Sequence, residues 1–201
     1  FNNILIRPGL AAAWNGLDVD TSDGPENGGI AIRDSKESGL TGTMFIFNNL
    51  IYKPTSDGQS ISVGGRGCLN LNGDGDSVKI KWDNNICITT PEVPFVGAGF
   101  QAENKLDNIS GTANVWFIEG GSSPFEIPNW SSNSISKNPD LTFSNSFVRL
   151  GSDAPMINSG TDKQINYDVY GTVRDSVIDI GPVEFSSLLS SPNPPASISI
   201  E

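Results

Sequence analysis

The chain has 201 residues, a formal net charge of −11 at neutral pH and no histidine. The charge argues against nucleic acid as a partner, because no basic stripe is present to displace counterions from phosphates. The absence of histidine excludes Ser-His-Asp and Cys-His catalysis, and histidine-ligated zinc or iron sites.

The composition is that of a turn-rich β protein. Gly occurs 22 times and Pro 13 times, and only 17% of the residues are charged, against about 25% in an average globular protein. Helix-type periodicity is nearly absent, so we expect an all-β fold. No apolar run reaches the roughly 18 to 20 residues that a membrane helix needs, so we expect no membrane insertion. The chain starts at Phe1 in what reads as a turn and strand, and we expect it to be a processed or truncated piece of a longer protein.

A short cassette occurs three times, and it consists of an aromatic residue, two asparagines and a β-prone run. Its copies are residues 1–6, 47–52 and 82–88. Asparagine tolerates the left-handed conformation and bonds its own backbone, so each Asn-Asn pair predicts a tight bend that leads into a strand. A turn-strand unit that recurs is typical of a solenoid, in which each unit buries its apolar side against its neighbours. The pairs begin at positions 2, 48 and 84, and this irregular spacing predicts loop insertions between the coils.

Short alternating segments predict the other strands. The alternating segments are residues 61–63, 69–71, 78–82 and 115–118. Residues 30–32 are a further short strand, and residues 44–52 are the longest apolar run, which the Asn-Asn bend divides into two strands. In 78–82 we expect Ile80 and Trp82 to face inward and both lysines to face outward. Strands this short, joined by bends of Asn-Asn and Gly type, favour a solenoid over the alternative, a β-sandwich.

Cys68 and Cys87 are the only cysteines, which excludes a structural zinc site of the Cys type. Cys87 alternates with Ile86 and Ile88, so it faces outward if the isoleucines face the core. The two cysteines are 19 residues apart, close to one coil of a solenoid of this size, so they could pair as a disulfide in an oxidising compartment. The favoured interpretation is a pair of free thiols that pack as small apolar groups.

Three segments near the C-terminal end carry a resemblance to a known family. Residues 153–160 read D-A-P-M-I-N-S-G, residues 168–174 read D-V-Y-G-T-V-R, and residues 179–185 read D-I-G-P-V-E-F. In order and spacing they resemble the closing element S-P-A-I-D-A-G, D-x-x-G-x-x-R and D-I-G-A-x-E of secreted bacterial parallel β-helix proteins of the pectate-lyase-like type. Asn158 stands where that family usually has Asp, and Pro182 where it has Ala. The match covers roughly the last quarter of the chain.

The resemblance implies a right-handed parallel β-helix with irregular loop insertions and a C-terminal cap. Residues 1–137 would form the coils and residues 138–185 the capping segment that seals the last coil, while the Ser/Pro-rich residues 186–201 read as a linker to a further module. It also implies an exported protein, extracellular or on the cell surface. An ion-paired structural network would hold the cap, with Arg174 as its bidentate centre. The expected members of this network are Asp168, Arg174, Asp179 and Glu184.

Two loops carry candidate cation ligands. The loop 70–76 places oxygen ligands at alternate positions, as in the first half of a calcium-binding loop. The bidentate acidic ligand expected at the last position of such a loop is missing, because Trp82 occupies that position. The ligands would be Asn70, Asn72, Asp74 and Asp76. The second is the acidic loop with Asp18, Asp20, Asp23 and Glu26. An ordinary polar turn and a solvated acidic loop are the favoured interpretations, and calcium is the alternative for both.

Lyases of the resembled family use a lysine or arginine to remove the proton next to a uronate carboxyl group. The candidates for such a base are Arg33 and Lys36, just beyond a predicted strand, while Lys79 and Lys81 project from one strand face. For each lysine a solvated side chain is the favoured interpretation. Trp116 and Trp130 are expected to be exposed, where they could stack on sugar rings, although core packing or loop anchoring is favoured for each.

Two functions remain open. The chain could be the C-terminal part of an exported bacterial β-helix that binds a polysaccharide and cleaves it by β-elimination, with catalytic coils upstream of Phe1. Alternatively, it is a non-catalytic cell-surface solenoid, an adhesin or stalk.

Overall fold

The structure is a computed structural model that describes residues 1–6, 29–33, 41–54, 67–72, 78–98, 103–122, 126–144 and 147–186. In this part of the chain the regular elements are short strands and a single 3-10 helix, which confirms the predicted all-β class. The elements are β1 (Ile4–Ile6), β2 (Ile30–Arg33), β3 (Gly42–Phe47), β4 (Leu50–Tyr52), β5 (Leu69–Asn72), β6 (Val78–Asp83), β7 (Ile86–Thr89), β8 (Val96–Ala98), η4 (Glu103–Asn108), β9 (Ile109–Thr112), β10 (Val115–Ile118), β11 (Ser131–Ser132), β12 (Leu141–Phe143) and β13 (Val148–Leu150).

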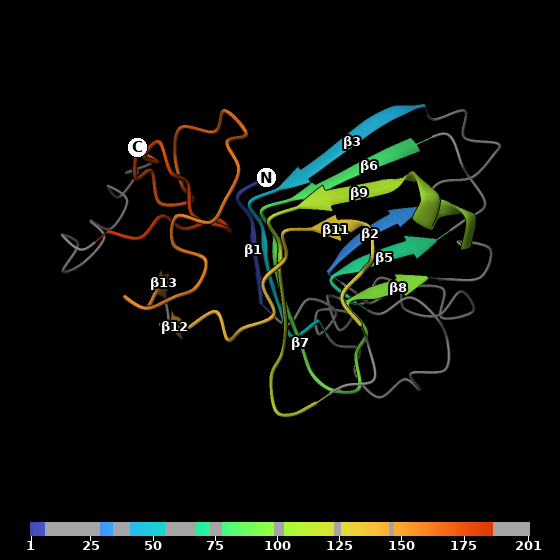
Figure 1. The fold of residues 1–201 in the computed structure, drawn as a ribbon, viewed down its shortest axis with the longest axis horizontal. Coiled ribbons are helices and arrows are strands. Elements are labelled where there is room, and N and C mark those ends of the chain that lie inside the picture. Colours follow the sequence, from blue (N-terminus) through green and yellow to red (C-terminus); the bar gives the residue numbers. More distant parts are fainter. Residues whose placement is uncertain are drawn as a thin grey trace, which may run out of the picture.

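The strands form three parallel sheets and one antiparallel pair (Figure 1). The first sheet has the order β1-β4-β7-β10, the second β3-β6-β9-β11 and the third β2-β5-β8, while β12 pairs with β13. From β1 to β11, strands that follow one another along the chain belong to different sheets. Ile4 pairs with Leu50, Leu50 with Ile86 and Ile86 with Val115, so equivalent positions lie above one another.

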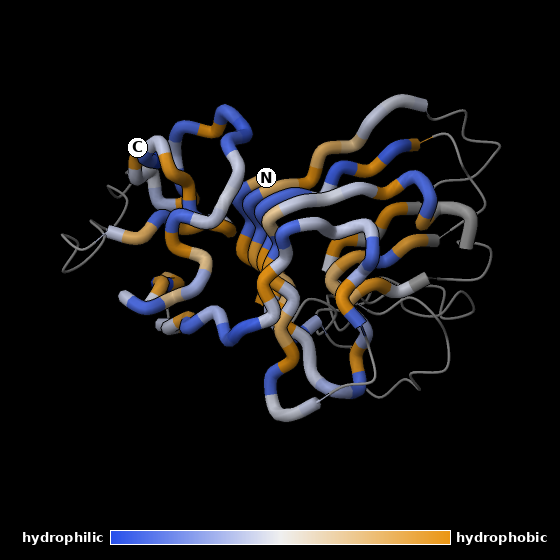
Figure 2. The backbone as a smooth tube through the Cα atoms, viewed as in Figure 1, coloured by the Kyte–Doolittle hydropathy of each residue, from blue (hydrophilic) through white to orange (hydrophobic). Residues whose placement is uncertain are grey.

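Two-residue bends connect the second sheet to the first. Asn48 and Asn84 have φ angles of 56° and 53°, in the left-handed region that asparagine tolerates. The predicted division of the run 44–52 into two strands is therefore confirmed. Ala113 makes an equivalent bend with a φ angle of 53°, and the sequence analysis did not identify this copy. The hydrophilic residues of the stacked bends line up beside the N-terminus (Figure 2).

The space between the sheets is filled by apolar side chains. Trp82 and Trp116 are buried there with their ring centroids 6.3 Å apart and nearly parallel. In β6, Ile80 and Trp82 are buried while the two lysines are exposed, which confirms the predicted alternation. Burial of large apolar groups of this kind stabilises a fold by about 1.5 to 3 kcal/mol per side chain.

A second apolar core lies on the opposite face of the β1-β4-β7-β10 sheet. The described residues 138–144 and 147–186 lie along this face (Figure 1). Met156 and Ile180 of this segment pack with Leu50, Ile86 and Val115 of the sheet. The sequence suggested a lid over the last coil. In the structure this segment instead packs against the outer face of the β1-β4-β7-β10 sheet. Both faces of this sheet are therefore covered.

Burial on both faces reverses two orientations expected from sequence. Cys87 and Trp116 point into the space between the sheets, whereas Ile86, Ile88 and Val115 point toward the C-terminal segment. The isoleucines face a core and Cys87 is nevertheless buried, so the outward orientation expected for Cys87 was wrong. Trp116 is 1% exposed, so the expected exposure was wrong and the favoured role of core packing is confirmed. An alternating pattern specifies two faces but does not say which one is interior.

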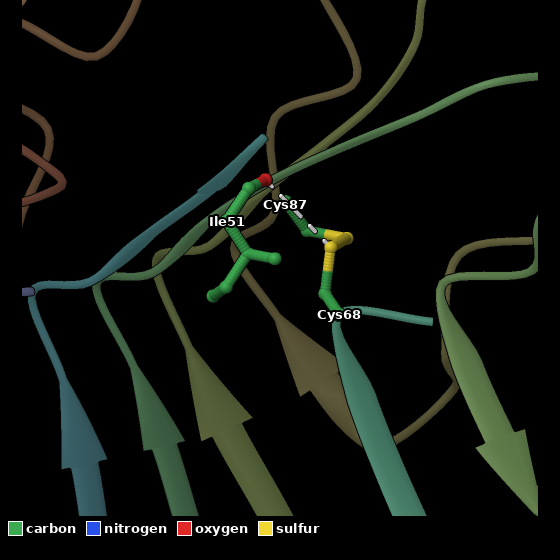
Figure 3. The surroundings of a disulfide bond; sticks show 3 residues. All are labelled: Ile51, Cys68 and Cys87. Atoms are coloured by element: carbon green, nitrogen blue, oxygen red, sulfur yellow. Dashed lines mark hydrogen bonds between the residues drawn. A yellow bond between two sulfur atoms is a disulfide. The ribbon is translucent and has the colours of Figure 1, made fainter. Parts of the chain in front are cut away.

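Cys68 and Cys87 form a disulfide with a Cα–Cα distance of 5.7 Å (Figure 3). The favoured interpretation of two free thiols was therefore wrong, and the alternative is confirmed. Cys68 precedes β5 and Cys87 lies in β7, so the bridge ties two sheets together across the interior. The Cys68 sulfur also lies 3.9 Å from the carbonyl oxygen of Ile51.

Loss of this bridge should destabilise the protein measurably. The bridge closes a loop with a sequence separation of 19 residues, and restraining an unfolded loop of that length stabilises the fold by about 3 kcal/mol. We expect Cys68→Ala with Cys87→Ala to lower the free energy of unfolding by that amount in urea titrations. Reductant should produce the same loss in the native sequence and no loss in the double variant. Equal stability with and without reductant would contradict the prediction.

Candidate functional site

A groove of about 630 Å³ lies over the outer face of the β3-β6-β9-β11 sheet. The sheet forms its floor, and a stretch of the C-terminal segment forms one wall. We refer to it as the outer groove. Its lining residues are Phe45, Phe47, Lys81, Asp83, Ser110, Gly111, Thr112, Ser132, Asp162, Lys163 and Gln164.

The strand register explains why these side chains share a face. Phe45 pairs with Lys81, and Lys81 pairs with Ser110 in the next strand. Two residues further on, Phe47 pairs with Asp83. Side chains two apart on a strand point the same way, so these rows form two parallel lines across the sheet.

The wall of the groove is fixed to the floor by an ion pair and by backbone contacts. Lys163 Nζ lies 2.7 Å from Asp83 Oδ2, and the other oxygen of Asp83 accepts the Thr112 amide proton at 2.9 Å. Asn84 donates to the carbonyl oxygen of Thr161 at 2.7 Å and accepts its amide proton at 2.9 Å. These contacts hold the shape of the groove, because they attach the wall at Thr161 and Lys163 to Asp83 and Asn84 at the end of β6.

Aromatic rings are exposed at the outer end of the groove. Phe45 is 61% exposed and Phe1 is 68% exposed. Phe47 lies between them, with its ring stacked on Phe1 at 6.4 Å and in edge contact with Phe45 at 6.0 Å. Exposed apolar surface beside polar groups is a mark of a binding surface.

The structure places few of the sequence-predicted site residues near one another. Arg33 ends β2, but its side chain lies outside the described residues, as does all of Lys36. Asn70 is 3% exposed in β5 and Asn72 ends that strand. Asp74, Asp76 and the acidic loop of Asp18, Asp20, Asp23 and Glu26 lie outside the described residues. Within the described ranges no group of three or more acidic or cysteine side chains is placed to hold a metal ion.

The sequence analysis singled out only Lys81 among the groove residues. No comparable signal marked the phenylalanines, because Phe45 and Phe47 lie in the continuous apolar run 44–47, of which only Ile46 is buried. No local signal pointed to Lys163, because it reaches the groove only when the C-terminal segment folds back onto the sheet. Trp130, the other tryptophan expected at the surface, packs edge-on against Trp116 at 5.8 Å.

The four residues expected to hold the C-terminal segment do come together, and we call them the buried charge cluster. Asp168, Arg174, Asp179 and Glu184 are each at most 7% exposed. Arg174 donates to Glu184 at 2.9 Å and to the carbonyl oxygen of Gly181 at 2.7 Å. Arg174 contacts one carboxyl group, through a single oxygen of Glu184, and is not the bidentate centre that the resemblance implied. Its other bonds go to backbone carbonyl oxygens of Asp179 and Gly181, and such a buried, hydrogen-bonded arrangement is consistent with a structural role.

Backbone amides compensate two of the carboxyl groups. Asp168 accepts the amide protons of Tyr170 and Thr172, each at 2.8 Å. Asp179 accepts the amide protons of Asn158 at 2.7 Å and of Phe185 at 2.6 Å. The carboxylates therefore fix the turns of this segment, which has little regular secondary structure.

The pH dependence of stability should report this cluster. Burial, reinforced by the nearby Asp179 carboxylate, raises the pKa of Glu184 from 4.5 to about 7, and burial also raises the pKa of Asp179. A folded-state pKa above the unfolded value means that the folded protein holds the proton more tightly. The stability from Glu184 is therefore complete below pH 4.5 and is lost as the pH rises through about 7, an effect of roughly 3 kcal/mol.

We expect Glu184→Gln to remove this part of the pH dependence, because glutamine carries no titrating proton. The free energy of unfolding, measured in urea from pH 4 to 8, should fall with rising pH more steeply in the native sequence than in the variant. Parallel curves for the two proteins would contradict the assignment to Glu184.

The described residues contain no helix that is long and apolar enough to cross a membrane. Comparison with protein-family models, with curated proteins and with solved structures finds no match to this chain.

Proposed function

We propose that the chain is part of an exported right-handed parallel β-helix that binds a polysaccharide in the outer groove. Three observations support the solenoid. The strands recur in the order second sheet, bend, first sheet. Each strand of the first sheet pairs in parallel with its counterpart in the next unit. The resemblance of the closing element to that of pectate-lyase-like proteins points the same way.

Export is supported by the disulfide. Bridges such as Cys68–Cys87 persist in oxidising compartments and are rare in the cytosol of most organisms. An extracellular or cell-surface location follows from this proposal.

The observation that carries the binding function is the outer groove itself. It crosses four strands, which at a spacing of about 4.8 Å gives a length on the order of 14 Å. The groove has aromatic rings at one end, hydroxyl and charged side chains along the floor, and an amide and charged side chains in the wall. This lining suits a sugar polymer, whose units have apolar faces and hydroxyl edges. A groove that is open along its length admits a chain that extends beyond it.

The geometry supports binding better than β-elimination. Lys163 is engaged by Asp83 at 2.7 Å, and Lys81 is an exposed side chain that donates to Ser110 Oγ at 2.6 Å. A catalytic base needs burial or neighbouring positive charge to release its proton near neutral pH. We therefore propose a non-catalytic surface protein that binds a glycan. For Asn70, Asn72, Asp74 and Asp76, calcium binding stays the alternative to an ordinary polar turn.

Retention in polysaccharide-containing native gels tests the proposal. We expect the protein to be slowed by at least one polysaccharide of a panel that contains both neutral and acidic polymers. Phe45→Ala should weaken the retention about 3- to 10-fold, because the exposed ring is lost without damage to the core. Val177→Ala, at an exposed position in the C-terminal segment, is the matched control and should bind as the native sequence does. Retention by none of the polymers would reject the function.

A further inference from the structure

The charges of the outer groove bear on the kind of glycan that it takes. Its charged lining residues are Lys81, Asp83, Asp162 and Lys163, so the formal charges balance. Asp83 and Lys163 are already paired with each other at 2.7 Å. Lys81 donates to Ser110 at 2.6 Å, and Asp162 accepts the amide proton of Gln164 at 2.6 Å.

We propose that the ligand of the outer groove is a neutral glycan, whose sugar units carry hydroxyl groups but no carboxylate, sulfate or phosphate. This inference rests on the proposed polysaccharide-binding function and narrows its substrate class. A polyanion would need an excess of cationic groups in the groove. Of the two lysines, Lys163 is already paired with Asp83, and the charge of Lys81 is offset by the Asp162 carboxylate that lines the same groove. The net charge of −11 on the whole chain would also repel a polyanion as it approaches.

A neutral sugar makes better use of the groups that are present. A hydroxyl both donates and accepts hydrogen bonds, so it can bond to the Asp162 carboxylate, the Gln164 amide and the Thr112 hydroxyl, all of which line the groove. Phe45, with 61% of its surface exposed, supplies an apolar face for the sugar ring. Binding of this kind does not require removal of water from a charged ligand, which is costly without a free counter-charge.

Titration calorimetry with defined oligosaccharides tests the inference on the complete chain. The neutral probes are cello-, manno- and xylo-oligosaccharides, and the acidic probe is an oligogalacturonate of equal length. Each is measured at about 0.05 M and about 0.5 M NaCl, a range over which the screening length falls severalfold. We expect at least one neutral probe to bind, with an affinity that changes less than about twofold with salt. Phe45→Ala should weaken it about 3- to 10-fold, and Val177→Ala should leave it unchanged.

The possible results distinguish a failure of the neutral-glycan inference from a failure of the proposed polysaccharide binding. Binding of the oligogalacturonate alone, or with an affinity equal to that of the neutral probes, would overturn the neutral-glycan inference and leave polysaccharide binding intact. Neutral binding that Phe45→Ala does not weaken would place the ligand outside the outer groove and would also overturn the inference. Failure of every probe, together with failure of retention in the polysaccharide gels, would reject the function itself.

Discussion

Replacing Asn85 with alanine should lower the free energy of unfolding by about 3 to 5 kcal/mol. Asn85 is fully buried, and its Oδ1 accepts both the backbone and the side-chain N–H of Asn49, at 3.0 and 2.9 Å. Its Nδ2 donates to the carbonyl oxygen of Ile46 at 2.9 Å. Alanine would remove these bonds from two buried backbone groups, the Asn49 N–H and the Ile46 carbonyl oxygen, and each such loss costs about 1 to 3 kcal/mol. Asn49 Nδ2 keeps its bond to the Phe47 carbonyl oxygen at 3.0 Å. Urea denaturation followed by tryptophan fluorescence would measure the loss.

The stacked asparagines Asn3, Asn49, Asn85 and Asn114 form a hydrogen-bonded ladder. Asn3 provides a matched control in this ladder. It makes the equivalent contact one unit earlier, with its Nδ2 2.9 Å from Asn49 Oδ1, but it is exposed. Water can replace the lost bond there, so Asn3→Ala should cost less than about 1 kcal/mol. Equal losses for the two variants would mean that the ladder stabilises the fold through something other than buried hydrogen bonds.

Local chemistry explains why the bends could be predicted from sequence. Each bend depends only on two neighbouring residues, as at Asn48 and Asn49. The first asparagine adopts a positive φ angle, and the second has a buried amide side chain. The copy at Ala113 and Asn114 was missed because its first residue is not asparagine. Asn114 still joins the ladder, since its Oδ1 accepts the Asn85 amide proton at 2.8 Å.

Contacts between distant segments explain what could not be predicted. The alternation around Cys87 could be read from the sequence. Which of the two faces points between the sheets depends on the C-terminal segment, which covers Ile86 and Ile88 on the outer face. Parallel sheets covered on both faces lose the contrast between apolar and polar sides that reveals orientation. The outer groove was hidden for the same reason, because Lys163 meets Asp83 only after this segment has packed against the sheet.

Replacing Arg174 with alanine should be similarly damaging, and the damage should depend on pH. The Arg174–Glu184 pair is almost completely buried, with side-chain exposures of 1% and 5%. Removal of one partner of a buried ion pair costs about 3 to 5 kcal/mol, because the remaining charge is left without compensation. We expect that loss at pH 8, where Glu184 is ionised. At pH 5, below its pKa of about 7, the carboxyl group can take a proton, and the loss should fall to about 1 to 3 kcal/mol from the hydrogen bonds to carbonyl oxygens.

A second ion pair serves as the control. Lys53 and Glu119 approach to 2.6 Å, but they are 28% and 42% exposed, and exposed pairs contribute about 1 kcal/mol or less. Glu119→Ala should therefore cost little at either pH. The double variant Arg174→Ala with Glu184→Gln should recover part of the loss at pH 8, since the Glu184 carboxylate that lost its partner is no longer present. A loss in Arg174→Ala that is the same at pH 5 and pH 8 would contradict the role of Glu184.

The same variant tests how the cluster supports the groove. The residues 162–164 that form the groove wall belong to the segment that the cluster fixes. Within it Asp179 accepts the Asn158 amide proton, and the Gly181 N–H joins the segment to the sheet by donating to the carbonyl oxygen of Asn84. We therefore expect Arg174→Ala to weaken glycan retention more at pH 8 than at pH 5, in parallel with its stability and without any change in the lining residues. Retention that follows pH equally in the native sequence and in the variant would mean that the wall holds its position independently of the cluster.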